Sequence, residues 1–276
     1  MMPLLSLAHL TLIDADPLAL IEAAAAGGFD AIGLRIVAPF ASDSIVPVIG
    51  DMPLQRRIKA RLAATGLRIL DVEAFWLHPQ TDIDTLKPAL DLAADLGARY
   101  LLTVGNDPGP SRMTANYARL CEAAQARGLR TMLEFIPYSC VQSLEAAHRL
   151  LTAAAPADAG LLVDALHLCR SGGSPSDVAL YEPGLFSYVQ ICDAPRASPP
   201  PELLRSEARG GRLYPGEGEL WLADFIAAFA PGTPVALEAP APKYAALPLP
   251  ERGRIAGAAS RQTLQKIYAA LNWPSS

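Results

Sequence analysis

The chain has 276 residues, 51% of them hydrophobic and 18% charged, which suits a single domain with one large core. Its net charge of -5 argues against a nucleic-acid partner, because phosphate binding needs clustered Lys and Arg. No apolar stretch reaches the roughly 20 residues that cross a bilayer, and the start, MMPLLSLAHLTLID, lacks the pattern of a secretory signal. We therefore expect a cytoplasmic protein that acts on small molecules without membrane contact.

Amphipathic Ala- and Leu-rich stretches alternate with short apolar runs from one end of the chain to the other. The first helix is expected to begin at Asp16 and Pro17, an N-cap followed by a first-turn proline, and to end near Gly27. Three later glycines, each between an amphipathic stretch and an apolar run, recur at intervals of 31 residues: Gly66, Gly97 and Gly128. This spacing is typical of a repeated helix-then-strand unit whose helix ends on a left-handed glycine.

Eight apolar runs are predicted strands: residues 4–12, 31–36, 67–75, 99–104, 130–135, 160–166, 187–192 and 234–239. Runs that are apolar on both faces are typical of parallel strands covered by helices. Eight such units predict a single (β/α)8 TIM barrel over residues 1–276, with its last helix at about residues 251–271. Residues 194–218 exceed the usual connection length and predict a long loop after strand seven.

Strands five to eight each end on an acidic or amide side chain: Glu134, Asp164, Gln190 and Glu238. One such carboxylate alone is explained as a helix cap or salt-bridge partner, whereas four at equivalent positions indicate a shared site at the barrel mouth. All four offer oxygen donors, which favours Mg²⁺ or Mn²⁺ over Zn²⁺ or Co²⁺. We therefore predict one divalent cation held by these residues.

Over essentially the whole chain, this pattern resembles the xylose isomerase-like TIM barrels, a family of sugar phosphate isomerases and epimerases. Glu134, Asp164 with His167 three residues later, and Glu238 match the family pattern. Gln190 stands where the family has a His after strand seven, and in this it resembles the bacterial 3-dehydroshikimate dehydratases of the same superfamily.

The resemblance implies a divalent-metal-dependent isomerase or epimerase of a sugar or sugar phosphate. In that chemistry the metal polarises a carbonyl, and Glu134 and Glu238 act as an acid–base pair around a metal-stabilised enediolate. His167 is either a catalytic donor to a substrate oxygen or a histidine satisfied within its loop. The alternative is a dehydratase, a lyase of a cyclic hydroxy-ketone such as 3-dehydroshikimate, in which the enolate expels a hydroxyl group as water.

Several other polar or aromatic residues are candidates for substrate binding. Arg196 lies six residues beyond Gln190, where family members that act on free ketoses have a substrate-binding Arg. Arg35 interrupts an apolar run and suits a carboxylate or phosphate. His9 follows strand one and Trp76 follows strand three, although packing explains these two equally well.

The predicted long loop contributes three further candidates: Arg205, Arg209 and Arg212. They either bind an anionic substrate or pair in solvent with Glu202 and Glu207 of the same loop. The expected substrate is a ketose, a ketose phosphate or a hydroxy-keto acid.

Two other classes fit the sequence poorly. A DNA-repair endonuclease of this fold uses a histidine-rich trinuclear zinc cluster, whereas this acidic chain has only four His. A barrel that merely binds a ligand would leave the intact set of oxygen donors unexplained. Related barrels often form dimers or tetramers, so a homo-oligomer is also open.

Overall fold

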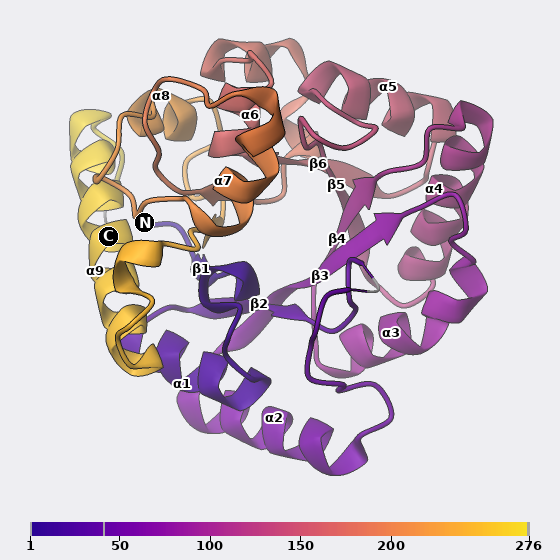
Figure 1. Cartoon of the computed structure of the whole chain (residues 1–276), viewed down its shortest axis with the longest axis horizontal. Helices are drawn as coiled ribbons and strands as arrows, with labels where there is room; N and C mark the ends of the chain where they lie inside the picture. Colours follow the sequence, from indigo (N-terminus) through magenta and orange to yellow (C-terminus); the bar gives the residue numbers. More distant parts are fainter. Residues whose placement is uncertain (1, 41, 275–276) are drawn as a thin grey trace.

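The computed structural model describes residues 2–40 and 42–274, so residues 1, 41, 275 and 276 of the predicted domain lie outside the described part. Eight parallel strands form a closed barrel in chain order, with β8 paired to β1 (Figure 1). The strands are β1 Leu5–Leu7, β2 Ala31–Arg35, β3 Arg68–Leu77, β4 Tyr100–Gly105, β5 Arg130–Glu134, β6 Ala159–Asp164, β7 Val189–Ile191 and β8 Val235–Leu237. The predicted (β/α)8 barrel is confirmed.

Helices surround the barrel (Figure 1). The α-helices are α1 Pro17–Gly27, α2 Met52–Thr65, α3 Ile83–Asp95, α4 Pro110–Gln125, α5 Leu144–Ala154, α6 Ala165–Arg170, α7 Leu204–Gly210, α8 Leu222–Ala227 and α9 Leu249–Ala270. Short 3-10 helices are η1 His9–Leu12, η2 Pro175–Leu180, η3 Pro183–Leu185, η4 Pro201–Leu203 and η5 Pro242–Tyr244. Within the described ranges, no helix combines the length and the apolarity that crossing a membrane requires.

The predicted start of the first helix is confirmed. The Asp16 carboxylate accepts hydrogen bonds from the backbone N–H groups of Leu18 and Ala19 at 2.8 and 2.9 Å, and Pro17 opens the helix. The three glycines that recur every 31 residues have φ values of 73°, 75° and 73°, as expected for helix ends in the left-handed region.

Two sequence predictions need correction. Residues 9–12 were expected to continue the first strand, but they form η1, because Thr11 Oγ1 donates to the Leu237 carbonyl at 2.8 Å and draws the chain inward. The long loop predicted for residues 194–218 is not confirmed, because η4 and α7 lie within it. A bidentate pair between Arg170 and Glu207, at 2.7 and 2.8 Å, joins α7 to α6.

Helices α1 and α9 pack so closely that two glycines of α9 have no room for a Cβ atom. A Cβ atom on Gly253 would lie 2.1 Å from the Ala23 carbonyl oxygen, and one on Gly257 would lie 2.1 Å from that of Gly27. Only glycine permits this contact, which fixes α9 against α1 and closes the outer ring of helices.

Candidate metal centre and active site

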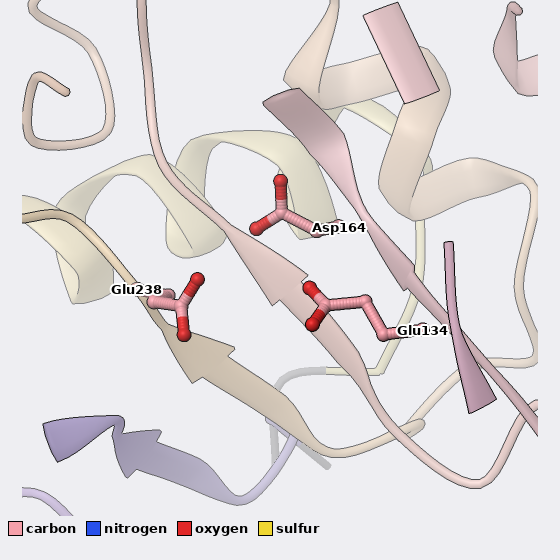
Figure 2. Close-up of side chains that lie close together, drawn as sticks. All are labelled: Glu134, Asp164 and Glu238. Atoms are coloured by element: carbon pink, nitrogen blue, oxygen red, sulfur yellow. The ribbon is translucent and has the colours of Figure 1, made fainter. Parts of the chain in front are cut away.

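Three carboxylates meet at the C-terminal ends of the strands. Glu134 ends β5, Asp164 ends β6 and Glu238 directly follows β8, and each offers an oxygen within 4.8 Å of the others. Figure 2 shows Glu134 and Glu238 with their carboxyl groups turned toward each other and Asp164 nearby. The exposed fractions are 4% for Glu134, 0% for Asp164 and 5% for Glu238, so all three carboxyl groups are removed from water.

Gln190 of β7 completes this group. Its Nε2 donates to Glu238 Oε1 at 3.3 Å, and its Oε1 is buried without a hydrogen-bond partner among the described residues. Glu134 Oε1 is buried and unpaired in the same way. Leaving buried acceptors unpaired is costly, and a cation would satisfy both. The donor set therefore fits a divalent cation that prefers oxygen ligands.

Burial and mutual repulsion set the protonation of these carboxyls. Burial, reinforced by the charges of Glu238 and Asp164, raises the pKa of Glu134 well above its ordinary value. Burial also raises the pKa of Glu238, to about 7, although Arg212 opposes the shift. Burial alone would raise the pKa of Asp164 too, but the Arg212 guanidinium and His167 outweigh it and hold that pKa below the ordinary value. Asp164 is thus the group most firmly ionised.

The Arg212 guanidinium, which holds the pKa of Asp164 down, is 1% exposed. Its Nε donates to the Ala208 carbonyl at 2.8 Å, and its Nη1 donates to Asp164 Oδ2 at 2.7 Å and to the Glu238 carbonyl at 2.9 Å. Its Nη2 lies 2.9 Å from Glu238 Oε2 and 3.5 Å from His167 Nε2. Two carboxylates and two backbone carbonyls thus surround the five N–H groups of this guanidinium.

His167 lies beside this group. Its backbone N–H donates to Asp164 Oδ1 at 2.9 Å, and its Nε2 is 3.9 Å from Glu134 Oε1. The Tyr138 ring packs edge-on against the imidazole at 5.9 Å between centroids. Burial lowers the pKa of His167 to about 4, which favours a neutral imidazole.

A second buried ion pair lies on the opposite strands. Arg35 ends β2 and is 5% exposed, and its Nη2 lies 3.9 Å from Oε1 of Glu73 on β3. The same Glu73 oxygen accepts the Leu10 N–H at 3.2 Å, while Oε2 is buried and unpaired. His9 uses Nδ1 to accept the Arg35 N–H at 3.0 Å and Nε2 to contact the Ala15 carbonyl at 3.0 Å. His9 therefore has both ring nitrogens engaged by the backbone.

The remaining predicted substrate residues lie farther out. Arg196 is exposed, and its side chain has no hydrogen bond or ion pair within residues 2–40 and 42–274. Arg205 stacks over the Phe40 ring at 4.6 Å, and Trp76 packs against that ring at 4.8 Å between centroids. Arg209 pairs with Asp43 at 3.0 Å. These contacts join α7 to the segment that follows β2, so Arg205 and Arg209 do not pair with the glutamates of their own segment.

Two buried groups were absent from the predicted site. Asp71 is 1% exposed with both oxygens unpaired, and burial, aided by Glu73 and Glu238, raises its pKa well above the ordinary value. Tyr188 stands with its buried hydroxyl group near the same charges. In the sequence, the signal for Asp71 was its position two residues before Glu73, because alternate residues of a strand lie on the same face.

Comparisons with known proteins bear on the family. The family model described as xylose isomerase-like TIM barrel matches residues 21–264. Among curated proteins, the chain is similar to the 3-dehydroshikimate dehydratase of Pseudomonas aeruginosa, with 28% identity over 224 residues. That alignment covers 75% of this chain and 33% of the relative, so the chain spans about a third of the relative's length.

Solved structures share the fold. An IOLI protein with a bound zinc atom has a TM-score of 0.77 and 17% identity, over 98% of this chain and 100% of that one. A D-allulose 3-epimerase from Methylomonas sp. has a TM-score of 0.68 and 19% identity, over 96% of this chain and 98% of that one. At these identities the likeness shows the common barrel alone.

Proposed function

The chain belongs to the xylose isomerase-like TIM barrel family, and from this premise we propose that it is a metal-dependent dehydratase of a cyclic hydroxy-ketone, of the 3-dehydroshikimate class. The observation that carries the proposal is Gln190 in place of a histidine beside three buried carboxylates. The similarity to the Pseudomonas aeruginosa dehydratase supports the same choice.

Glu134, Asp164, Gln190 and Glu238 would hold the cation, with Mg²⁺ or Mn²⁺ preferred because every donor is oxygen. When bound, the cation supplies a Lewis acid for the ketone oxygen of the substrate. The zinc-bound neighbour keeps Zn²⁺ among the ions to be tested.

Glu134 and Glu238 perform the proton transfers. Both carboxyls are buried near each other and have raised pKa values in the metal-free protein, and a bound cation would favour the ionised form that a base needs. Glu134 removes the proton from the carbon beside the ketone, and Glu238 gives its proton to the departing hydroxyl group. One C–H and one C–O bond break, a C=C bond forms and one water leaves, after which Glu134 releases the proton it took and Glu238 regains one from solvent. His167 lies close enough to Glu134 to orient it.

The test is proton NMR of 3-dehydroshikimate with the Mg²⁺-loaded protein in D₂O. The proposal predicts aromatic signals that require the metal and vanish in Glu134→Gln. As a matched control, Glu122→Gln changes an exposed glutamate and should retain the reaction. Full turnover by Glu134→Gln, or an inert 3-dehydroshikimate with every metal tried, would rule out this mechanism.

An isomerase or epimerase of a sugar or sugar phosphate is the second candidate. Two buried glutamates that face each other are suited to removing a proton and returning one, and an epimerase is among the structural neighbours. The same NMR experiment with ketoses and ketose phosphates separates the two candidates. Deuterium beside the carbonyl together with an isomeric sugar would favour the isomerase.

A further inference from the structure

Two arginines are buried at the barrel mouth, and their hydrogen-bonding differs. Arg212 has two carboxylates and two backbone carbonyls around its guanidinium. Arg35 has only the 3.9 Å approach to Glu73, its Nε is buried and unpaired, and its guanidinium donates no hydrogen bond within the part of the chain that is described. We propose that Arg35 binds a carboxylate of the substrate, whereas Arg212 positions the metal-binding carboxylates and contacts no substrate.

The hydrogen bonds of Arg212 give it a fixed place. To reach a substrate it would have to leave two carboxylates and two backbone carbonyls, which would then lie buried without partners. Its contacts instead hold Asp164 and Glu238 at a set separation, which is what a metal centre needs from the groups around its ligands. Arg212 is therefore a positioning residue.

Arg35 has the opposite arrangement. A buried guanidinium with unused donors is unfavourable unless a ligand supplies acceptors, and two parallel N–H groups match a carboxylate. In a closed ring of eight strands, β2 lies opposite β6, so Arg35 and Asp164 stand on opposite sides of the mouth. A substrate whose ketone faces the metal-binding residues would thus present its other end to Arg35.

The surrounding charge favours a singly charged anion. Glu73 lies beside Arg35, and three more carboxylates line the mouth, whereas Arg205 and Arg209 are engaged by Phe40 and Asp43. A phosphate group carries more negative charge and calls for more donors than one guanidinium offers. This inference rests on the proposed function and narrows its substrate to a hydroxy-keto acid.

The experiment compares two probes that differ in one group: 3,4-dihydroxybenzoate and 3,4-dihydroxybenzamide. Calorimetry with the Mg²⁺-loaded protein should show that the acid binds about 10- to 100-fold more tightly than the amide. Arg35→Gln should abolish this preference and bind the amide normally. Arg35→Lys, which keeps the charge but loses the paired donors, should fall between. Arg209→Gln is the matched control and should keep the full preference.

A wild-type protein without preference for the acid would overturn the inference, as would an Arg35→Gln variant that keeps it. Loss of the preference in Arg209→Gln would move the anion site to α7 and also overturn it. Circular dichroism establishes that each variant is folded before calorimetry. Because binding is measured without turnover, the preference can be present even if 3-dehydroshikimate is not dehydrated, and the two failures are distinguished.

Discussion

In the half of the barrel mouth formed by β5 to β8, the buried cation Arg212 is paired with two carboxylates and two backbone carbonyls, whereas in the half formed by β1 to β3 Arg35 and Glu73 keep unpaired atoms. Both halves bury charge inside one barrel. Among the atoms left unpaired in the first half are two acceptors that suit a metal ion, Glu134 Oε1 and Gln190 Oε1. In the second half, the Arg35 guanidinium donates no hydrogen bond within the described residues and approaches Glu73 only to 3.9 Å. A binding site can therefore be located by asking which buried charges the protein has left uncompensated.

The largest effect is expected when Glu134, the carboxylate at the end of β5 with an unpaired oxygen, is neutralised. Glu134→Gln should lower kcat by about 10³-fold, within the range attributed to a general base, without loss of folding. The measurement is steady-state turnover of 3-dehydroshikimate with Mg²⁺. A kcat within tenfold of wild type would show that Glu134 is not the base.

Removing each arginine tests the contrast directly. Arg212→Met leaves Asp164 and Glu238 buried without their counter-ion and should lower the unfolding free energy by about 3–5 kcal/mol. Arg35→Met should lower it by less than about 1 kcal/mol, because Arg35 donates no hydrogen bond from its guanidinium and the burial of its charge costs about as much as the 3.9 Å contact with Glu73 returns. Urea unfolding of the metal-free proteins measures both. Equal losses would remove the distinction between the two halves. Mg²⁺ should reduce the loss in Arg212→Met, since the cation replaces part of the missing charge.

The pH dependence of stability tests the raised carboxyl pKa values. A carboxyl whose pKa is raised on folding favours the folded state at low pH, and this contribution is lost as pH rises through the folded value. For Glu238, with a pKa near 7 against an ordinary 4.5, this loss falls between about pH 4.5 and 7. His167, whose pKa is lowered to about 4, contributes in the opposite direction up to its ordinary value of 6.5. The metal-free protein is therefore compared with Glu238→Gln, which should lose less stability over the window. Asp164 titrates below this window. Thermal unfolding should also show a larger Mg²⁺-induced rise in Tm at pH 8 than at pH 5, because protons compete with the metal. Equal changes in metal-free Tm over the window for the wild-type protein and Glu238→Gln would contradict the assignment.

The smallest effect is expected at Gln190, the proposed amide ligand. Gln190→His introduces an imidazole, so affinity for Zn²⁺ relative to Mg²⁺ should increase by about tenfold. Competition calorimetry with the two ions measures the ratio, and Gln125→His, a change at the end of α4, is the control. An unchanged ratio would place Gln190 outside the coordination sphere.

The barrel itself was predictable because its signals are local. Alternating apolar runs and recurrent glycines such as Gly66 identify strands and helix ends without knowledge of the tertiary structure. η1 was missed because its geometry depends on a hydrogen bond from Thr11 to Leu237, 226 residues away in the chain. Helix α7 was missed because its proline-rich approach resembles a loop.

The four strand-end residues were predictable as a group, whereas the roles of the arginines were not. Arg205, Arg209 and Arg212 look equivalent in the sequence, yet one stacks on an aromatic ring, one pairs at the rim and one enters the barrel. Which of them is buried depends on how α7 meets β8. Arg35 was predictable as a charge that must reach the mouth, but its lack of partners is visible only in three dimensions.

The glycine contact between α1 and α9 has a consequence for synthesis on the ribosome. Arg261 of α9 donates to the Gly28 carbonyl across 233 residues of sequence, and β1 likewise pairs with β8. In an emerging chain, the surface of α1 around Ala23 and Gly27 therefore stays uncovered until nearly all of the barrel has been translated. One edge of β1 stays unpaired for the same time. During most of its synthesis the chain therefore exposes apolar surface that the finished barrel buries.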